Sequence, residues 1–333
     1  MNKNSKTIIV FCSHLCLNDE MKPYETKEWI VLAENLLENK IQPSDFITFA
    51  DEDFYNFFKS TNIFKEQAQI DSEIERIKKL IERTARIDYE IEKYEKMGIK
   101  IMTRADDIYP KILKTKLGKN CPPLFYYAGN PIILKQKFIG FVGSRNIDII
   151  DEEFTRDTVF KINKKGYGIV SGGAKGVDTI STTTSLKSNI PAVEYISDSM
   201  KRKLKNSEVQ NYINKNLLLI MSVVNPDAGF DTGMAMARNR LIYAQAAASI
   251  IIRADLKKGG TWSGASENLK KRYSPSFCWN HIEYEGNQEL IKMGAYPIDE
   301  TWDGDISIHN MSEKNNILDG YKPKQISIFD EIK

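Results

Sequence analysis

Residues 138–145 read FIGFVGSR and residues 168–178 read GIVSGGAKGVD. In each stretch a short apolar run leads directly into a glycine-containing loop that carries a cation, Arg145 or Lys175. Uninterrupted apolar runs of this length are typical of strands that are covered on both faces of a sheet. Further runs of the same kind occur at residues 191–196, 217–221 and 250–252.

Helical patterns alternate with these apolar runs. Candidate helices lie near residues 152–164, 177–187, 206–215 and 233–247, and another lies near residues 263–272. Strands and helices that alternate in this way predict an α/β fold with a Rossmann-like, doubly wound parallel sheet. Such a sheet binds its ligands at the carboxyl ends of the strands.

The first 100 residues follow a different pattern. Apolar residues recur at helical spacing from Thr26 to about Asn39, and a long amphipathic stripe runs from Ile70 to Tyr94. The stripe lasts about three heptads, so a surface helix packed on its neighbours is favoured over a coiled-coil partner site. Residues 1–100 are therefore predicted to form a small N-terminal helical domain.

Changes in composition indicate the other domain boundaries. Prolines and a glycine between Cys121 and Pro131 break any helix, so residues 101–136 are interpreted as a lead-in to a domain that ends near residue 285. Residues 137–285 hold 21 basic and 15 acidic side chains, a net charge of +6, whereas residues 286–333 hold 5 and 9. A basic middle segment suits a phosphate-binding surface. Residues 286–333 are predicted to be an acidic C-terminal extension.

The composition is that of an ordinary soluble protein, with 41% hydrophobic and 28% charged residues. No apolar run approaches the ~18 residues of a membrane span, and no signal peptide is convincing, so a cytoplasmic protein is expected. The cysteines Cys12, Cys16, Cys121 and Cys278 are too scattered for a disulfide scaffold. Cys12, His14 and Cys16 lack the second ligand pair of a zinc site. We therefore predict no metal and no cofactor.

Three loops at predicted strand ends have the character of phosphate-binding loops. Glycines let the backbone approach an anion closely, and the N–H groups at the start of a helix point toward it. Three such loops in one sheet predict a phosphate-ligand site, although none matches a standard nucleotide-binding motif. The loop residues that we select are Ser144, Arg145, Gly172, Gly173, Lys175, Gly176, Gly260 and Thr261.

Two arginines flank an asparagine in the helix predicted at residues 233–247. Arg238 and Arg240 cannot share one face of a helix, so one can brace the loops while the other reaches a ligand. The alternative is a solvated helix face, but the apolar neighbours indicate burial, and buried arginines need anionic partners. Arg238, Asn239 and Arg240 therefore join the candidate phosphate-binding residues.

A catalytic set is not visible in these loops. No histidine lies in them, and Ser144 has no base that the sequence reveals. Asp178 stands in the first turn of its predicted helix, where capping and loop bracing explain a carboxylate better than general-base catalysis does. The sequence therefore predicts a binding protein rather than an enzyme.

At these residues the chain resembles the DprA/Smf family of bacterial DNA-processing proteins, from about Ile99 to Ala295. The resemblance implies an extended Rossmann domain, a positively charged pocket for single-stranded DNA, a homodimer, and transfer of the DNA to the recombinase RecA. It implies Arg145, Lys175 and Arg240 as DNA-phosphate ligands and Gly172, Gly173 and Thr261 as residues that shape the pocket. The blocks that carry it are 105–110, 122–130, 142–145, 171–178, 238–242 and the Gly260–Thr261 loop.

The chain departs from the family at two places. Residues 257–265 read KKGGTWSGA where family members carry a Gly-Ser-x-x-Thr-Ala element, and residues 286–333 are too short and acidic for the winged-helix domain of many members. The resulting hypothesis is a non-enzymatic protein that binds and protects single-stranded DNA in transformation, repair or phage-related DNA handling.

An alternative hypothesis comes from the same broad group of folds. A small-nucleotide sensor, or an enzyme resembling the nucleoside-monophosphate phosphoribohydrolases, would use a Pro-Gly-Gly-x-Gly-Thr loop and an acidic catalytic residue. Gly259-Gly260-Thr261 matches part of that loop, and Glu267 is the nearest acid.

The C-terminal tail carries one further pattern. Residues 325–330 read QISIFD within a polar, acidic segment. The pattern resembles the peptides by which bacterial DNA enzymes dock on the polymerase sliding clamp, with Gln325, Ile328 and Phe329 as the anchors. The alternative is that these apolar residues form an edge strand or fold back on the chain's own domain.

Overall fold

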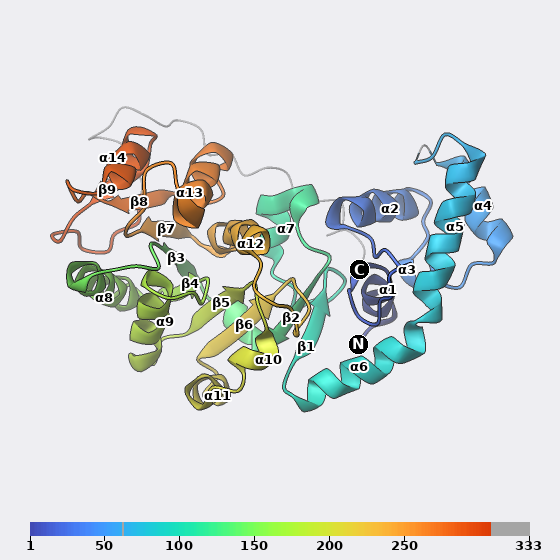
Figure 1. The fold of residues 1–333 in the computed structure, drawn as a ribbon, viewed down its shortest axis with the longest axis horizontal. Coiled ribbons are helices and arrows are strands. Elements are labelled where there is room, and N and C mark those ends of the chain that lie inside the picture. The colour runs from blue at the N-terminus through green and yellow to red at the C-terminus, as the bar shows by residue number, and fades with distance from the viewer. Residues whose placement is uncertain (62, 308–333) are drawn as a thin grey trace. The chain divides into compact units, whose positions relative to one another are not determined.

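The computed structural model describes residues 1–61 and 63–307, which form two compact units (Figure 1). We call the first the helical unit; it comprises residues 1–109, 119–127 and 223–225. The second, the α/β unit, comprises residues 110–118 and 128–222 together with the described chain from residue 226 onward. The predicted tail anchors Gln325, Ile328 and Phe329 lie outside the described residues.

The α/β unit is built on a parallel sheet. The strands follow the order β6-β5-β4-β3-β7-β8-β9, and every neighbouring pair is parallel. The prediction of a doubly wound sheet is confirmed, because the strand order reverses between β3 and β7, where such folds bind ligands. The strands are β3 (Phe138–Val142), β4 (Gly168–Ser171), β5 (Ala192–Ile196), β6 (Leu218–Ser222), β7 (Ala248–Ile251), β8 (Ser276–Trp279) and β9 (Tyr296–Ile298).

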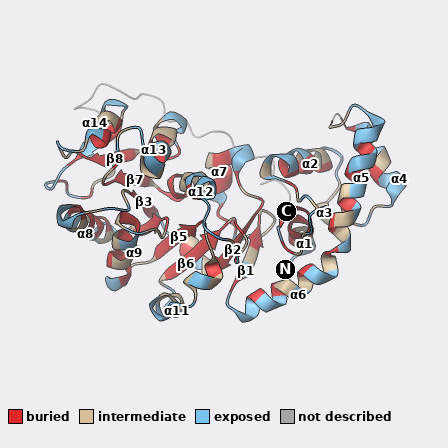
Figure 2. Cartoon of the chain, in the orientation of Figure 1, coloured by how far each residue is buried: buried red, intermediate tan, exposed pale blue. Residues whose placement is uncertain are grey.

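Helices cover both faces of this sheet, with α8, α9 and α11 on one side and α12 and α13 on the other (Figure 1). The sheet between them is buried (Figure 2), which explains why its strands are continuous apolar runs. The helices are α7 (Lys111–Leu117), α8 (Ile149–Lys164), α9 (Val177–Lys187), α10 (Met200–Lys203), α11 (Ser207–Asn214), α12 (Thr232–Gln245), α13 (Gly259–Lys271) and α14 (Glu285–Lys292), with a 3-10 turn at Pro131–Lys135.

Several elements of the α/β unit begin earlier than their patterns predict; α8, for example, begins at Ile149 instead of near residue 152. β7 begins at Ala248, and its second residue, Ser249, is fully buried. A polar side chain is tolerated there because the Ser249 hydroxyl forms a 2.8 Å hydrogen bond with the Ser274 hydroxyl. α13 begins at Gly259 instead of near residue 263, so Gly260 and Thr261 lie in the first turn of a helix and not in a preceding loop. Their amide groups are therefore helix N-terminal donors.

The segment predicted to be an acidic extension contributes regular structure. α14 begins at Glu285, and β9 pairs with β8 along the edge of the sheet. The Asn287 side chain in α14 donates to the carbonyl oxygens of Ile252 and Trp279, at 2.8 and 2.9 Å. Residues up to Ile298 thus belong to the α/β unit, and β9 extends its sheet.

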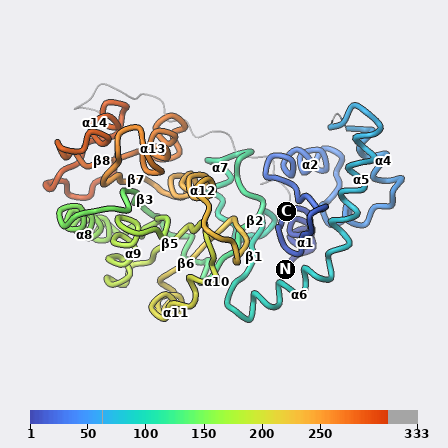
Figure 3. The backbone as a smooth tube through the Cα atoms, in the orientation of Figure 1, coloured from blue at the N-terminus to red at the C-terminus, as the bar shows by residue number. Residues whose placement is uncertain are grey.

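The helical unit packs short helices around an aromatic core. Phe46 lies at its centre and contacts the rings of Phe54 and Phe57, with centroids 5.0 and 5.3 Å away. After α6 the chain enters the antiparallel pair β1 and β2 (Figure 3). The elements are α1 (Lys3–Cys12), α2 (Thr26–Glu38), α3 (Pro43–Phe46), α4 (Asp51–Ser60), α5 (Gln67–Glu82), α6 (Thr84–Lys96), β1 (Lys100–Thr103), a 3-10 turn (Gly118–Asn120) and β2 (Leu124–Ala128).

The long stripe between Ile70 and Tyr94 is divided between two helices, α5 and α6. The break falls at Arg83, whose side chain is fully buried. Its guanidinium donates to the Leu15 carbonyl at 2.5 Å and to the Val10 carbonyl. Burial lowers the pKa of Arg83 to about 10. The chain thus turns where an arginine caps the C-terminal end of α1.

The described chain has neither a membrane-spanning helix nor a cluster of metal-ligating side chains. Among residues 1–61 and 63–307, no helix combines the length and apolar character of a membrane span. The same residues contain no group of three or more His, Cys, Asp or Glu side chains that could hold a metal ion. Cys12 lies in α1, where burial raises the pKa of its thiol well above the ordinary value.

Candidate functional site

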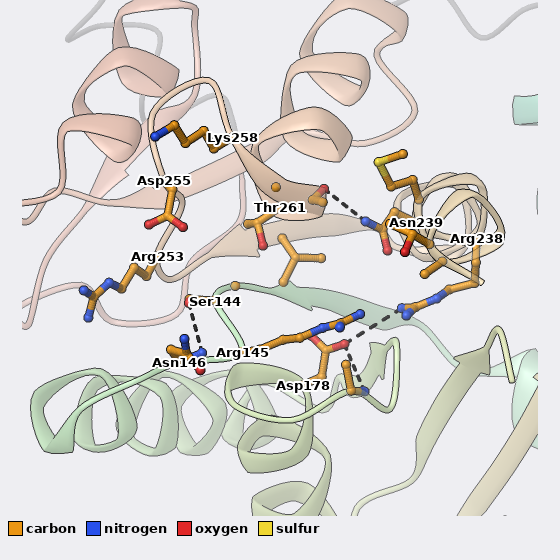
Figure 4. Close-up of a pocket in the computed structure, with 18 of the residues that line it drawn as sticks. Ser144, Arg145, Asn146, Asp178, Arg238, Asn239, Arg253, Asp255, Lys258 and Thr261 are labelled. Carbon is orange, nitrogen blue, oxygen red and sulfur yellow. Dashed lines mark hydrogen bonds and ion pairs between the residues drawn. The ribbon is translucent and has the colours of Figure 1, made fainter. Parts of the chain in front are cut away.

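A cavity of about 390 Å³ opens beside the carboxyl ends of β3 and β7, where the strand order of the sheet reverses (Figure 4). Its walls come from the loop after β3, the first half of α12, and the segment from β7 into α13. We call it the switch-point pocket. It brings together six of the residues selected from the sequence: Ser144, Arg145, Arg238, Asn239, Gly260 and Thr261.

The loop after β3 packs closely against the loop after β4 and the first residue of α9. A Cβ atom at Gly143 would lie 2.4 Å from Val177 Cγ2, and one at Gly176 would lie 2.3 Å from the carbonyl oxygen of Ser144. Gly176 also has a φ of +75°, which glycine adopts without strain. The Ser144 hydroxyl accepts a hydrogen bond from the Asn146 amide at 3.1 Å. Glycines thus allow the two loops to touch and fix the backbone around Ser144.

Arg238 braces the loop after β4 from inside the protein. Its side chain is 6% exposed, and Nη1 lies 3.8 Å from Asp178 Oδ2. Asp178 Oδ2 also accepts a hydrogen bond from the Ala174 amide at 3.3 Å. A Cβ atom at Gly172 would lie 1.4 Å from Arg238 Nη1, so the guanidinium occupies the space that a side chain would fill. Arg238 is therefore the bracing member of the two arginines, and Asp178 braces its loop as the sequence predicts.

Burial affects both members of this pair. Burial raises the pKa of Asp178 and lowers the pKa of Arg238. The charge of Arg238 partly offsets the first shift, and the charge of Asp178 partly offsets the second. Arg145 lowers the pKa of Arg238 further, because a second positive charge lies nearby. In Figure 4 the side chain of Arg145 extends across the pocket toward Asp178 and Arg238. Arg145 and Arg238 thus bring two guanidinium groups to the same side of the pocket as the carboxylate of Asp178.

The N-terminus of α13 adds further donors to the switch-point pocket. Its N-cap residue, Lys258, makes no side-chain capping hydrogen bond, and Gly259, Gly260 and Thr261 of the first turn line the pocket. The first N–H groups of a helix have no partner within the helix and attract anions. Asn239 Nδ2 donates to the Gly260 carbonyl at 3.1 Å and so holds α12 against this turn.

One more polar atom lacks a partner in the same place. Within the described chain, the Nε atom of Arg238 is buried and makes no hydrogen bond. A buried donor of this kind is unfavourable unless a ligand or water completes it. Arg238 and the uncapped start of α13 thus line one pocket, and guanidinium groups and helix N-terminal N–H groups are both donors that attract anions.

Other selected residues lie outside the lining of the switch-point pocket. Gly172, Gly173, Lys175 and Gly176 form the adjacent loop after β4, in which Lys175 is exposed. Arg240 is half-buried on α12, and its charge lowers the pKa of Tyr273 against the opposing effect of burial. Glu267 accepts a hydrogen bond from the Tyr273 hydroxyl at 3.3 Å and does not line the pocket either.

The lining residues that sequence reasoning missed include Asn146, Phe230, Arg253, Asp255 and Lys258. Arg253 Nη1 lies 2.8 Å from Asp151 Oδ2 and 3.3 Å from Asp148 Oδ2, so its charge is largely compensated. Lys258 and Asp255 lie just before the glycine pair Gly259-Gly260, and this closeness in sequence to a selected loop could have identified them as site residues. Phe230 lies in an irregular segment, where no periodicity indicates its direction.

Comparison with known proteins relates this site to a family. The family model of DNA recombination-mediator protein A matches residues 100–306. The DNA processing protein DprA of Bacillus subtilis is 25% identical over 228 residues, which cover 67% of this chain and 74% of that protein.

Two solved structures are similar to the chain. DprA from Streptococcus pneumoniae superposes with a TM-score of 0.62 at 20% identity, over 83% of this chain and 95% of that one. DNA processing protein A from Helicobacter pylori, whose structure describes a single-stranded DNA binding mode, gives 0.50 at 26% identity, over 65% of this chain and 94% of that one. The first likeness concerns the fold alone. Because the family model spans the α/β sheet and the whole switch-point pocket, the chain belongs to the DNA recombination-mediator protein A family of DNA-processing proteins.

Proposed function

We propose that the chain binds single-stranded DNA through the phosphates, which enter the switch-point pocket and the adjacent loop after β4. The observation that carries the proposal is that one cavity is lined both by Arg238, whose buried Nε has no hydrogen-bond partner in the described chain, and by the uncapped start of α13. Both groups donate hydrogen bonds to anions, and the related protein of Helicobacter pylori binds single-stranded DNA.

The roles of the cations follow from their exposure. Arg145 and Lys175 are exposed on neighbouring loops, so they can meet successive phosphates without a change in the fold. Arg238 is buried and orients the loop after β4, so its contact with DNA is limited to the floor of the pocket. Phosphate contacts of this kind position the strand but do not read its bases. Binding should therefore be insensitive to sequence and should weaken as salt rises.

The wider role rests on family membership. We propose that the protein protects the bound strand and passes it to a recombinase of the RecA type, as a homodimer and without catalysis of its own. The family's description as a recombination mediator supports the transfer step. The alternative of a small-nucleotide sensor is favoured by one observation, since a cavity of about 390 Å³ is large enough for a single nucleotide. Its suggested catalytic acid, Glu267, lies outside that cavity.

Fluorescence polarisation of the full chain tests the proposal. Labelled oligothymidylate, the matching duplex and mononucleotides are titrated in parallel over a range of salt concentrations. We expect tight binding to the single strand alone, with an affinity that falls as salt rises. Arg145→Ala, Lys175→Ala and Arg240→Ala should each weaken binding and each lower the steepness of the salt dependence by about 0.7, the value for one phosphate contact on a single strand.

Lys187→Ala is the matched control. Lys187 is an exposed lysine in the last turn of α9, at the end of that helix remote from the carboxyl ends of the strands, so its loss should leave binding unchanged. If the folded wild-type chain fails to bind the single strand, or if all three phosphate variants bind as wild type does, the proposal is wrong. Preferential binding or turnover of a mononucleotide would instead support the sensor or phosphoribohydrolase alternative.

A further inference from the structure

A large aromatic side chain stands exposed at the switch-point pocket. Phe230 is 54% exposed and lines the pocket, between the end of β6 and the start of α12. Met236, 45% exposed in the first half of α12, lines the same pocket. Exposed apolar side chains are unremarkable when scattered singly over a surface. Here two of them border a cavity that charged side chains such as Arg145 and Lys258 also line, so together they favour a ligand with both apolar and anionic parts.

The charge beside the ring strengthens this interpretation. The guanidinium carbon of Arg145 lies 5.2 Å from the centroid of the Phe230 ring, within the range of a cation–π contact. Arg145 is also a proposed phosphate ligand. One surface therefore offers a flat aromatic ring and a cation side by side, and a nucleotide carries a flat base and a phosphate in the same relation.

We infer that Phe230 is a stacking platform for a base of the bound single strand, with Met236 contacting the edge of the same base. The inference rests on the proposed function and adds a contact with a base of the DNA to the proposed contacts with its phosphates. Stacking requires only the π-face that every base possesses, so Phe230 raises affinity for single strands without selecting a sequence. Duplex DNA keeps its bases stacked on one another and so offers no free face to Phe230.

Two ligands separate base stacking from phosphate binding. One is a labelled oligothymidylate of about 16 nucleotides, and the other is an abasic deoxyribose-phosphate chain of the same length. Phe230→Ala should weaken binding of the oligothymidylate by between about fivefold and 150-fold, the range for one base–aromatic stack. The same variant should bind the abasic chain as wild type does. Phe230→Trp should retain affinity for the oligothymidylate, with its added fluorescence quenched on binding.

Phe160→Ala is the matched control, because Phe160 is a comparably exposed phenylalanine (47%) on α8 that does not line the pocket. Its removal should change neither affinity. The inference is overturned if Phe230→Ala binds the oligothymidylate as wild type does. It is also overturned if the variant loses affinity for both ligands equally, since Phe230 would then act only by positioning Arg145. Failure of the wild-type chain to bind either ligand would instead refute the proposed function itself.

Discussion

Replacement of Arg238 by methionine removes the cation that lies against the buried carboxylate of Asp178. The two side chains are only 6% and 10% exposed, and Arg238 Nη1 lies 3.8 Å from Asp178 Oδ2. Methionine fills similar space without the charge, so the main effect is electrostatic. Burial already raises the pKa of Asp178, and the loss of Arg238 raises it further. We therefore expect Arg238→Met to lower the free energy of unfolding at neutral pH.

The magnitude has a ceiling, because Asp178 can take up a proton instead of staying charged. Starting from the ordinary pKa of 3.8, protonation costs about 1.4 kcal/mol per pH unit, or about 4 kcal/mol at pH 7 and about 1.6 kcal/mol at pH 5. Breaking a buried ion pair by removing one partner generally costs about 3–5 kcal/mol. The expected loss is thus roughly 3 kcal/mol at pH 7 and at most about 1.6 kcal/mol at pH 5.

The sign of this pH dependence follows from the direction of the pKa shift. A carboxyl whose pKa is raised by folding opposes the folded state once it ionises, and the loss of Arg238 raises that pKa further. The deficit of the variant relative to wild type therefore grows as pH rises through the already raised pKa of Asp178 in the wild-type fold. Urea unfolding at pH 5 and pH 7 measures the deficit. The transition can be followed by tryptophan fluorescence, since Trp262, Trp279 and Trp302 lie in the α/β unit.

Two further variants isolate the pair. Asp178→Asn, added to Arg238→Met, removes the stranded charge and should recover most of the stability lost at pH 7. Arg156→Met is the matched control, because Arg156 pairs with Glu152 at the surface of α8, with side chains 37% and 39% exposed. Its loss should cost less than about 1 kcal/mol. Equal losses for Arg238→Met at both pH values, or no loss at pH 7, would refute the reasoning.

Three other predictions concern positions where the packing is explicit. Gly172→Ala places a methyl group 1.4 Å from Arg238 Nη1, so the free energy of unfolding and the affinity for oligothymidylate should both fall. The Cβ of Gly260→Ala meets nothing nearer than 3.5 Å, so the unfolding of that variant should match wild type. Denaturation measures the stability of each variant and fluorescence polarisation measures its affinity. The Lys116 ammonium donates to the Ala246 carbonyl at 2.7 Å, and burial lowers the pKa of Lys116 to about 8. NMR of the protein with methylated lysines should therefore show one lysine that titrates well below the rest. A pKa near 10.5 for Lys116 would contradict this prediction. Arg83→Met leaves two carbonyl groups of the helical unit without their hydrogen-bond donor, so the free energy of unfolding of the variant should fall by roughly 2–4 kcal/mol. If amide hydrogen exchange in α1 is the same in the variant as in wild type, Arg83 does not cap that helix.

The sequence predicts the sheet well because burial on both faces leaves a clear pattern. The bounds of β3 and α9 agree with the predicted residues, since each is marked by an apolar run or a loop that ends in glycine. The start of β7 could not be predicted, because Ser249 is buried by a hydrogen bond to a serine distant in sequence. The break at Arg83 depends likewise on carbonyl groups of an earlier helix.

The candidate site was predictable in its loops but not in its side chains. Glycine and helix-start patterns indicate where an anion can bind: Gly172 directly follows β4, as the sequence predicts, whereas Gly260 lies in the first turn of α13. Helical spacing shows that Arg238 and Arg240 face different ways, but only tertiary packing determines that Arg238 turns inward. Phe230 follows no pattern at all, because an irregular segment has no period from which a direction can be inferred.

The position of β3 at the centre of the strand order has a consequence for synthesis of the chain. β3 pairs with β4 on one side, but its other edge stays open until residues 248–251 of β7 have been made. While β4, β5 and β6 emerge from the ribosome, the unfinished domain therefore exposes an unpaired strand edge, which invites aggregation. The last wall of the pocket arrives only with Thr261. A chain that stops before this residue would therefore carry an incomplete switch-point pocket.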